Sequence, residues 1–225
     1  MFGKERFIIK TSHGRALYYS VTDSGTAAEV TTPFARHPLF GAEVKPSGRV
    51  SVPGSVILDG TTYPVTRIGD RAFWDCGDLF SVELPDSVTS IGHEAFFSCR
   101  ALSLVNIPPS VASIGSEAFF GCRSLLVVDI PDAVKVVGKE TFWGCRSLAD
   151  VTLGAGVTTV EKGAFAECSH LQTLTCRAAV PPVVTDLGVF EDVDRGICVR
   201  VPAASVDLYR AAYGWKDFVR IVGMD

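Results

Sequence analysis

Cysteine and histidine are the side chains of this sequence most able to do chemistry, and five of the seven cysteines recur every 23 residues. Zinc sites use close pairs such as C-x-x-C, and the sequence contains none. Disulfides need side chains that face each other, whereas equivalent positions of a repeat project in parallel. The pattern therefore predicts a stack of small, buried, apolar residues at Cys76, Cys99, Cys122, Cys145 and Cys168. A disulfide between Cys176 and Cys198 stays open, because these two could lie on neighbouring strands.

The histidines belong to no catalytic pattern. His93 and His170 occupy positions that vary between copies of the repeat, and neither has the partner that a general base needs. The sequence contains no H-E-x-x-H, nucleophile elbow or P-loop. Gly154-Ala155-Gly156 lacks the third glycine and the helix of a dinucleotide loop. We therefore expect no catalytic residue, no metal site and no cofactor.

A repeated sequence motif sets where these side chains lie in the fold. Its copies begin at Ile68, Ile91, Ile114, Val137 and Val160, so each is 23 residues long. Two apolar positions keep that step without a slip: Phe73, Phe96, Phe119, Phe142 and Phe165, and Leu79, Leu102, Leu125, Leu148 and Leu171. Self-similarity at a fixed period of this size predicts a solenoid in which each repeat forms one coil.

The spacing within one repeat predicts its local structure. Val82 and Leu84 point one way and Glu83 the other, which is strand behaviour, and stacked copies would pair in parallel. A second short strand is expected over residues 88–91. The apolar spacing of residues 94–99 predicts a single helical turn.

The phrase I-G-x-x-A-F-x-x-C-x-x-L-x-x-V-x-I-P-x-x-V resembles the leucine-rich repeat of BspA-like bacterial surface proteins. Residues 164–168 and 107–111 are close to the family phrase, and five tandem copies make the match specific. The resemblance implies a right-handed superhelix of short parallel strands and short helical turns. It also implies a secreted or surface-anchored protein of gut or oral bacteria that adheres to host proteins or to other cells. It carries over no catalytic residue.

The sequence outside the full repeats predicts a cap at each end of one solenoid domain, 1–225. We expect a β-rich N-terminal cap (1–49), a partial repeat with a hairpin at Asp59-Gly60 (50–67), and five repeats (68–180). A degenerate repeat (181–202) and a helical C-terminal cap (203–225) follow. The cap should hold a helix over residues 204–213 with Val206, Tyr209 and Tyr213 on one face, ended by Gly214, and should pack Trp215 and Phe218 under the last coil.

Composition narrows the partners. The chain has 225 residues, 47% of them hydrophobic, which suffices for one buried core. A net charge of −4 without a basic stripe makes nucleic acid an unfavourable partner. No apolar run is long enough for membrane insertion. No signal peptide is visible after Met1. A location at the cell surface therefore requires that a leader was removed or that the natural chain is longer. The alternative is a cytoplasmic member of the family.

A solenoid repeats its surface as well as its core, and the first surface column lies on the strands. It comprises Glu83, Asn106, Asp129, Thr152 and Thr175, beside Ser81, Leu104, Val127, Asp150 and Thr173. The face should be polar and mildly acidic, with an apolar spot at Leu104 and Val127. It is either a partner-binding surface or a solvated sheet face.

Two further columns lie on the predicted turns. Four aromatic residues each follow a buried phenylalanine: Trp74, Phe97, Phe120 and Trp143. They form either a platform for sugars or for an apolar patch of a partner, or a stack that ties coils together. Arg100, Arg123 and Arg146 form either a strip for anionic glycans or structural ion pairs with Glu94, Glu117 and Glu140.

The sequence thus favours a non-enzymatic adhesin that binds a host extracellular protein or glycan. The alternatives are a rigid spacer or assembly scaffold, and an accessory module of a longer enzyme.

Overall fold

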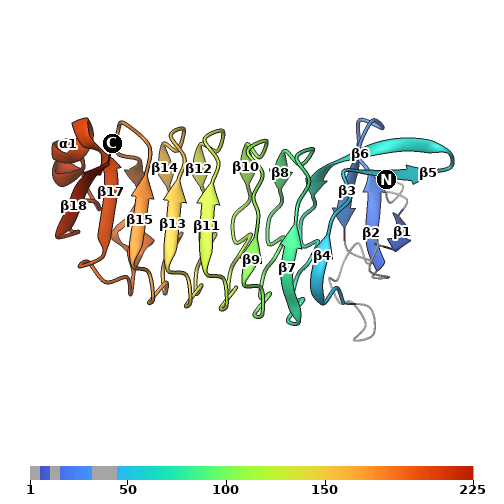
Figure 1. Cartoon of the computed structure of the whole chain (residues 1–225), viewed down its shortest axis with the longest axis horizontal. Helices are drawn as coiled ribbons and strands as arrows, with labels where there is room; N and C mark the ends of the chain where they lie inside the picture. The colour runs from blue at the N-terminus through green and yellow to red at the C-terminus, as the bar shows by residue number, and fades with distance from the viewer. Residues whose placement is uncertain (1–5, 11–15, 32–44, 225) are drawn as a thin grey trace.

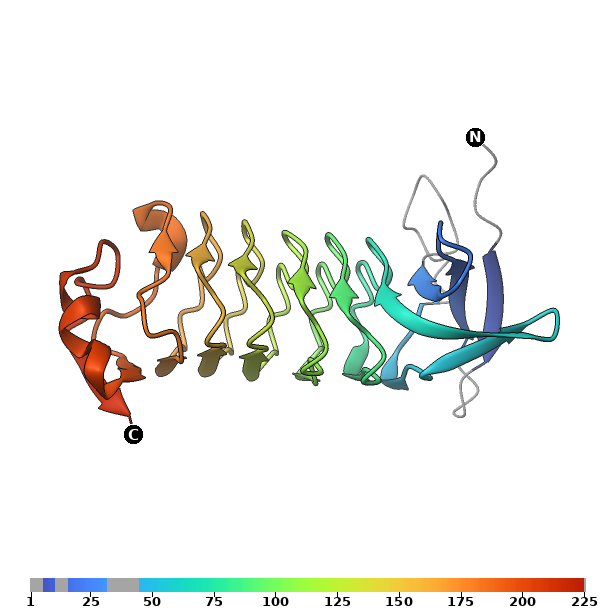
Figure 2. The ribbon, with the colours of Figure 1, turned by 90° about the horizontal axis from the view of Figure 1, so that it is seen from above.

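A computed structural model describes residues 6–10, 16–31 and 45–224 and shows coils stacked along one long axis (Figure 1). Two columns of short strands run along opposite sides of the stack, and turns connect them (Figure 2). The predicted leucine-rich-repeat solenoid is therefore confirmed. α1 (Val206–Ala211) has six residues, far fewer than the roughly 20 that a bilayer span needs, and the described part of the chain holds no candidate span.

Except at one step, between β9 and β11, the first strand of each coil pairs in parallel with the equivalent strand of the next coil. Asp129 lies opposite Thr152, and Thr152 opposite Thr175, so the register advances by one 23-residue repeat. Alternation is clear in β11, whose residues are in turn exposed and buried, because neighbouring side chains point to opposite faces. The strands of this column are β4 (Gly48–Ser51), β7 (Leu79–Glu83), β9 (Leu104–Val105), β11 (Val127–Ile130), β13 (Asp150–Leu153), β15 (Thr173–Cys176), β17 (Cys198–Pro202) and β18 (Arg220–Met224).

The predicted second strand is also present, with its apolar residue turned inward in every coil. Ile91 and Val160 are buried, whereas the residues before them are partly exposed. This column comprises β6 (Thr61–Ile68), β8 (Ser90–Ile91), β10 (Ser113–Ile114), β12 (Val136–Val137), β14 (Thr159–Val160) and β16 (Val183–Val184).

Consecutive turns occupy the segment where one helical turn was expected, so that detail of the prediction is wrong. Glu94 and Ser98 have φ of 51° and 57°, in the left-handed region. Within the coil the Phe97 N–H donates to Glu94 O at 3.1 Å, while the neighbouring Phe96 N–H donates to Ala118 O of the next coil at 2.7 Å. A helix would direct all these N–H groups along its own axis. The turns instead use alternate N–H groups to join coils.

The two strand columns are interrupted at the same step of the stack. Within the described residues, no sheet pairing joins β9 to β11 or β10 to β12. We call this step the seam. One long backbone hydrogen bond, from Leu126 N–H to Ser103 O at 3.3 Å, crosses it. The turns of the same two coils stay joined, since Phe96 N–H donates to Ala118 O at 2.7 Å.

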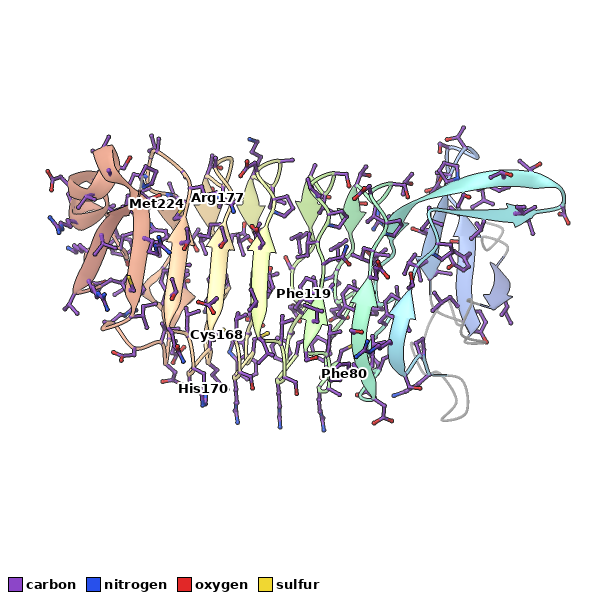
Figure 3. The ribbon with its side chains drawn as sticks, viewed as in Figure 1. Phe80, Phe119, Cys168, His170, Arg177 and Met224 are labelled. Carbon is purple, nitrogen blue, oxygen red and sulfur yellow. The ribbon has the colours of Figure 1, made fainter. Side chains whose placement is uncertain are left out.

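The core is a set of stacked columns, one residue per coil. The rings of Phe96, Phe119 and Phe142 lie nearly parallel, with centroids 5.1 and 5.3 Å apart. All the repeat phenylalanines and cysteines are buried. Figure 3 labels Phe119 and Cys168 within this stack. Each coil alone would expose these side chains, so neighbours complete the core.

The N-terminal cap is the predicted small antiparallel sheet. It consists of β1 (Arg6–Lys10), β2 (Ala16–Val21) and β3 (Ala28–Thr31), and β3 continues the second strand column by pairing with β6. β5 (Ser55–Leu58) and β6 form a hairpin, as the Asp59-Gly60 turn predicted, and both turn residues have positive φ. Part of the N-terminal cap predicted over residues 1–49 lies outside the described residues.

The C-terminal cap closes the other end with aromatic side chains. Trp215 and Phe218 are buried against the ring of Phe190, whose centroid lies 5.8 and 5.1 Å from theirs, as predicted. The helix is shorter than expected: η1 (Leu187–Phe190) and η2 (Ala203–Ser205) are 3-10 turns, and α1 ends at Ala211. Tyr213 is 54% exposed, so its expected place on the buried face is wrong; it lies beyond the helix.

Candidate functional site

The outward residues of the first strand column form the candidate site, which we call the strand face. Its two rows are Glu83, Asn106, Asp129, Thr152 and Thr175, and Ser81, Leu104, Val127, Asp150 and Thr173. Glu83, Asp129 and Asp150 are exposed, and Leu104 and Val127 are 59% and 48% exposed. The structure thus brings the predicted residues onto one open face, with three carboxylates around an apolar spot.

Ladder pairing sets the order of groups on the C-terminal part of the strand face. Asp129, Thr152, Thr175 and Arg200 lie side by side on β11, β13, β15 and β17. Arg177 reaches Asp129 from two coils away, with 3.4 Å between Nη2 and Oδ2. Both side chains are about half exposed, so this pair contributes little stability. The row therefore offers a partner a carboxylate, two hydroxyls and a guanidinium in sequence.

Asn106 differs from the rest of its row. Its Oδ1 accepts from Leu84 N–H at 2.7 Å, and its Nδ2 donates to Leu84 O at 2.9 Å. The side chain thereby takes the ladder position that the backbone takes elsewhere, and β9 ends at Val105. Asn106 is thus a structural residue of the strand face as well as a surface group, and it lies beside the seam.

A shallow hollow of about 520 Å³ lies at the N-terminal part of the strand face. Ser81, Glu83 and Asn106 line it together with Leu104 and Arg49. Arg49 also lies over the ring of Phe80, with 5.9 Å from Cζ to the centroid. Phe80, labelled on β7 in Figure 3, is 47% exposed. The hollow therefore combines both charges, an amide, a hydroxyl and apolar groups, which suits hydrogen-bonded recognition of a peptide or a sugar.

The aromatic column on the turns is a stack. Phe97 lies 6.0 Å from Trp74 and 4.6 Å from Phe120, and Phe120 lies 4.5 Å from Trp143, all nearly parallel. These rings are half-buried. Their faces cover one another, which favours the structural interpretation of the column over the sugar platform.

The expected pairing of the arginine column is wrong. Arg146 binds Glu167 at 2.8 Å, Arg71 binds Glu94, and Lys139 lies 3.3 Å from Glu140. The glutamates begin the turn segment and the arginines follow its end, so the two columns lie on opposite ends of it. In the described part of the chain no ion pair involves Arg100 or Arg123, and both are exposed.

The cysteine column is buried, as predicted, and its thiols also form hydrogen bonds that the sequence does not reveal. From Cys99 onward, each Sγ donates to the carbonyl of the phenylalanine 26 residues earlier, for example Cys122 to Phe96 O at 3.2 Å and Cys168 to Phe142 O at 3.3 Å. Burial raises the pKa of the Cys99, Cys122 and Cys145 thiols and raises the pKa of Cys168 to about 12. These thiols are therefore poor nucleophiles in the folded protein.

The second pair of cysteines is not bonded. Cys198 lies opposite Thr173, three residues along the strand from Cys176, and both are free. A strand rises roughly 3.3 Å per residue, so this offset exceeds the reach of a disulfide. The histidines His13 and His37 fall outside the described residues. His170 is exposed, and Figure 3 shows it at the rim of the stack.

Stacked coils with parallel strands, buried leucine and phenylalanine columns and a cap at each end define a leucine-rich-repeat solenoid. Residues 66–186 match the BspA type leucine-rich repeat region in six copies, and the chain belongs to this family. The sequence predicted five full repeats together with one partial and one degenerate repeat. A search of curated proteins finds no match.

Solved structures support the same fold. The chain is similar to the leucine-rich repeat protein of T. pallidum, with 25% identity, a TM-score of 0.61, and coverage of 88% of this chain and 89% of that chain. It is also similar to the pneumococcal vaccine antigen PcpA, with 18% identity, a TM-score of 0.63, and coverage of 89% and 51%. A leucine-rich repeat protein from Bacteroides ovatus gives 24% identity, a TM-score of 0.53, and coverage of 92% and 66%. At these two lower identities the likeness shows the fold alone.

Proposed function

We propose that this protein is a non-enzymatic recognition module at a bacterial surface, and that its strand face binds a host extracellular protein or glycan. The observation that carries the proposal is the open strand face, where Glu83, Asp129 and Asp150 surround the exposed Leu104 and Val127. Exposed apolar side chains ringed by charged groups are typical of recognition surfaces. Membership of a family of structural repeat proteins supports the same function.

The rigidity of the stack also supports recognition. On the C-terminal side of the seam, each strand of the strand face is fixed by its neighbours, as Asp129, Thr152 and Thr175 show. A partner would bind without ordering flexible segments, and this lowers the entropic cost of association. We further propose that residues 1–225 act as one solenoid domain with the caps and repeats described above.

A binding survey of extracellular-matrix proteins and host glycans tests the proposal. The test variant changes Glu83, Asp129 and Asp150 to Arg, because these carboxylates are exposed and Asn106 is needed for the fold. The control changes Asp59, Asp192 and Asp207 to Arg, which alters net charge equally away from the strand face. We expect specific binding that the test variant loses and the control keeps.

Two results would contradict the proposed site. Binding lost equally in both variants would indicate a net-charge effect, and binding kept in both would direct attention to the exposed Arg100 and Arg123. Absence of any binding would favour the alternative function, a rigid spacer or scaffold.

A further inference from the structure

Three potential metal ligands come together on the consecutive turns that follow β8 and β10. They are His93 and Glu94 of one coil and Glu117 of the next. The imidazole nitrogen and the two carboxylate oxygens all lie within 4.8 Å of one another. The repeat pattern offers no hint of the cluster, because His93 occupies a position that varies between copies.

The histidine is oriented as a ligand. Its Nδ1 lies 2.8 Å from the backbone oxygen of Ser116 in the next coil. A carbonyl can only accept, so Nδ1 carries the proton and Nε2 presents its lone pair. A hydrogen bond of this kind commonly fixes the tautomer of metal-binding histidines. Here the fixing group belongs to the backbone, outside the cluster.

Nε2 lies close to one of the two carboxylates. Nε2 lies 3.5 Å from Oε1 of Glu94. Two ligand atoms of a tetrahedral zinc ion, each about 2.0 Å from the metal, lie roughly 3.3 Å apart. This pair of atoms therefore already has nearly the required separation. Glu117 is only partly buried on its turn, so its side chain can rotate to supply the third ligand.

Charge around the cluster favours a cation. Asp70 accepts a hydrogen bond from His93 N–H at 3.0 Å, which adds a third carboxylate to Glu94 and Glu117. Two guanidinium groups oppose these three carboxylates: Arg67 binds Asp70, and Arg71 binds Glu94. Glu117 forms no ion pair with any described residue, whereas the next glutamate of its column, Glu140, has Lys139 at 3.3 Å.

We propose that His93 Nε2, Glu94 and Glu117 bind a zinc ion, with a fourth position open to water or to a side chain of a partner. One imidazole and two carboxylates suit zinc, whereas magnesium and calcium prefer oxygen ligands alone. The ion would join adjacent coils, because its ligands come from both. This site is separate from the strand face and does not depend on the proposed recognition function.

Calorimetric titration of the purified full chain with Zn²⁺ tests the site, with Co²⁺ as a spectroscopic probe of ligand geometry. The chain has three other histidines and seven cysteines, which could bind zinc elsewhere. The test therefore depends on whether single substitutions in the cluster abolish or weaken the binding of one zinc ion per chain. We expect His93→Ala and Glu117→Gln each to raise the dissociation constant of one bound zinc ion at least tenfold. His170→Ala, which removes an exposed histidine elsewhere, should leave it unchanged.

A substitution that is expected to strengthen zinc binding separates loss of a metal ligand from structural damage. Arg71→Gln removes the cation that occupies Glu94, so zinc binding should tighten even though an ion pair of the fold is lost. The circular dichroism spectrum of each variant verifies folding, and Glu117→Gln serves if His93→Ala unfolds. The proposal is overturned if no equivalent depends on His93 or Glu117, or if Arg71→Gln weakens binding.

Discussion

The side chain of Asn106 forms hydrogen bonds with both backbone groups of Leu84: Oδ1 accepts from Leu84 N–H at 2.7 Å, and Nδ2 donates to Leu84 O at 2.9 Å. The side chain acts as a short strand neighbour for β7. Because the backbone of Asn106 does not take this role, β9 has only two residues, and β11 begins a new sheet.

Asn106→Asp should destabilise the protein by about 1–3 kcal/mol, because a carboxylate cannot donate to Leu84 O and leaves that group without its hydrogen bond. Denaturant unfolding measures the change. Asp129→Asn is the matched control: it occupies the same row, where the backbone makes the ladder, and should change stability by less than about 0.5 kcal/mol. Equal effects of the two substitutions would contradict the role assigned to Asn106.

Phe119→Ala should cost about 3–5 kcal/mol, because it empties the middle of a buried ring stack whose neighbours lie 5.1 and 5.3 Å away. The unfolding midpoint in urea reports the loss. Phe80→Ala removes the same side chain from a site that is 47% exposed, and about 1 kcal/mol or less is expected there. A small effect at Phe119 would show that the stack does not carry the core.

Gly115→Ala should destabilise the stack by about 1–3 kcal/mol, since its new Cβ would lie 2.5 Å from the backbone nitrogen of His93. Gly138 occupies the same place one coil later, where the nearest atom is Ser116 Oγ at 3.1 Å, a side chain that can move. Gly138→Ala should therefore be nearly neutral. Thermal unfolding of the two variants compares them, and the reverse ranking would contradict the close approach of the coils.

Native thiol labelling should show one fast cysteine and six slow ones. Cys198 is partly exposed on β17, whereas the other six cysteines are buried. Reaction with a chromogenic disulfide gives the number of fast thiols, and Cys198→Ser should abolish the fast phase. Rapid labelling of several cysteines in the native protein would argue against the buried column.

Alkaline pH should destabilise the fold through the cysteine column. Burial raises the thiol pKa in the folded state, for Cys168 to about 12, whereas a thiol of the unfolded chain ionises near about 8.5. The folded state therefore holds the extra protons, and stability is full below about pH 8.5 and falls as pH rises toward the folded pKa. The slope approaches about 1.4 kcal/mol per pH unit for each buried thiol.

Unfolding midpoints measured between pH 7 and pH 10 test this slope. A variant with Cys122→Ala and Cys145→Ala provides the control, because it has fewer thiols to ionise and should depend less on pH. A slope that the two alanines leave unchanged would assign the alkaline effect to other groups.

The strict period explains which features were predictable from the sequence. Phe119 and Cys122 recur at a fixed step, and a fixed step can only mean that equivalent side chains meet in neighbouring coils. Their burial and both strand columns follow from this spacing. The same logic placed Glu83 and Asp129 on one exposed face.

Departures from the period were not predictable, because the repeat treats different residues as equivalent. Asn106 aligns with Glu83 and Asp129, and nothing in the spacing separates a side chain that faces solvent from one that binds backbone. Glu94 adopts positive φ although glycine is the usual signal for that conformation, so its turn resembled a helix in sequence. The glutamate and arginine columns were paired by proximity along the chain, whereas Arg71 reaches Glu94 from the preceding coil.

The seam has a mechanical consequence. A solenoid stretched by its two ends transmits tension through the bonds between coils, and most steps share that tension between two strand ladders and the turns. At the seam the turns and the stacked rings of Phe96 and Phe119 carry nearly all of it. A pulling force would therefore open the stack there first, into two shorter stacks that the chain still links and that each keep one cap.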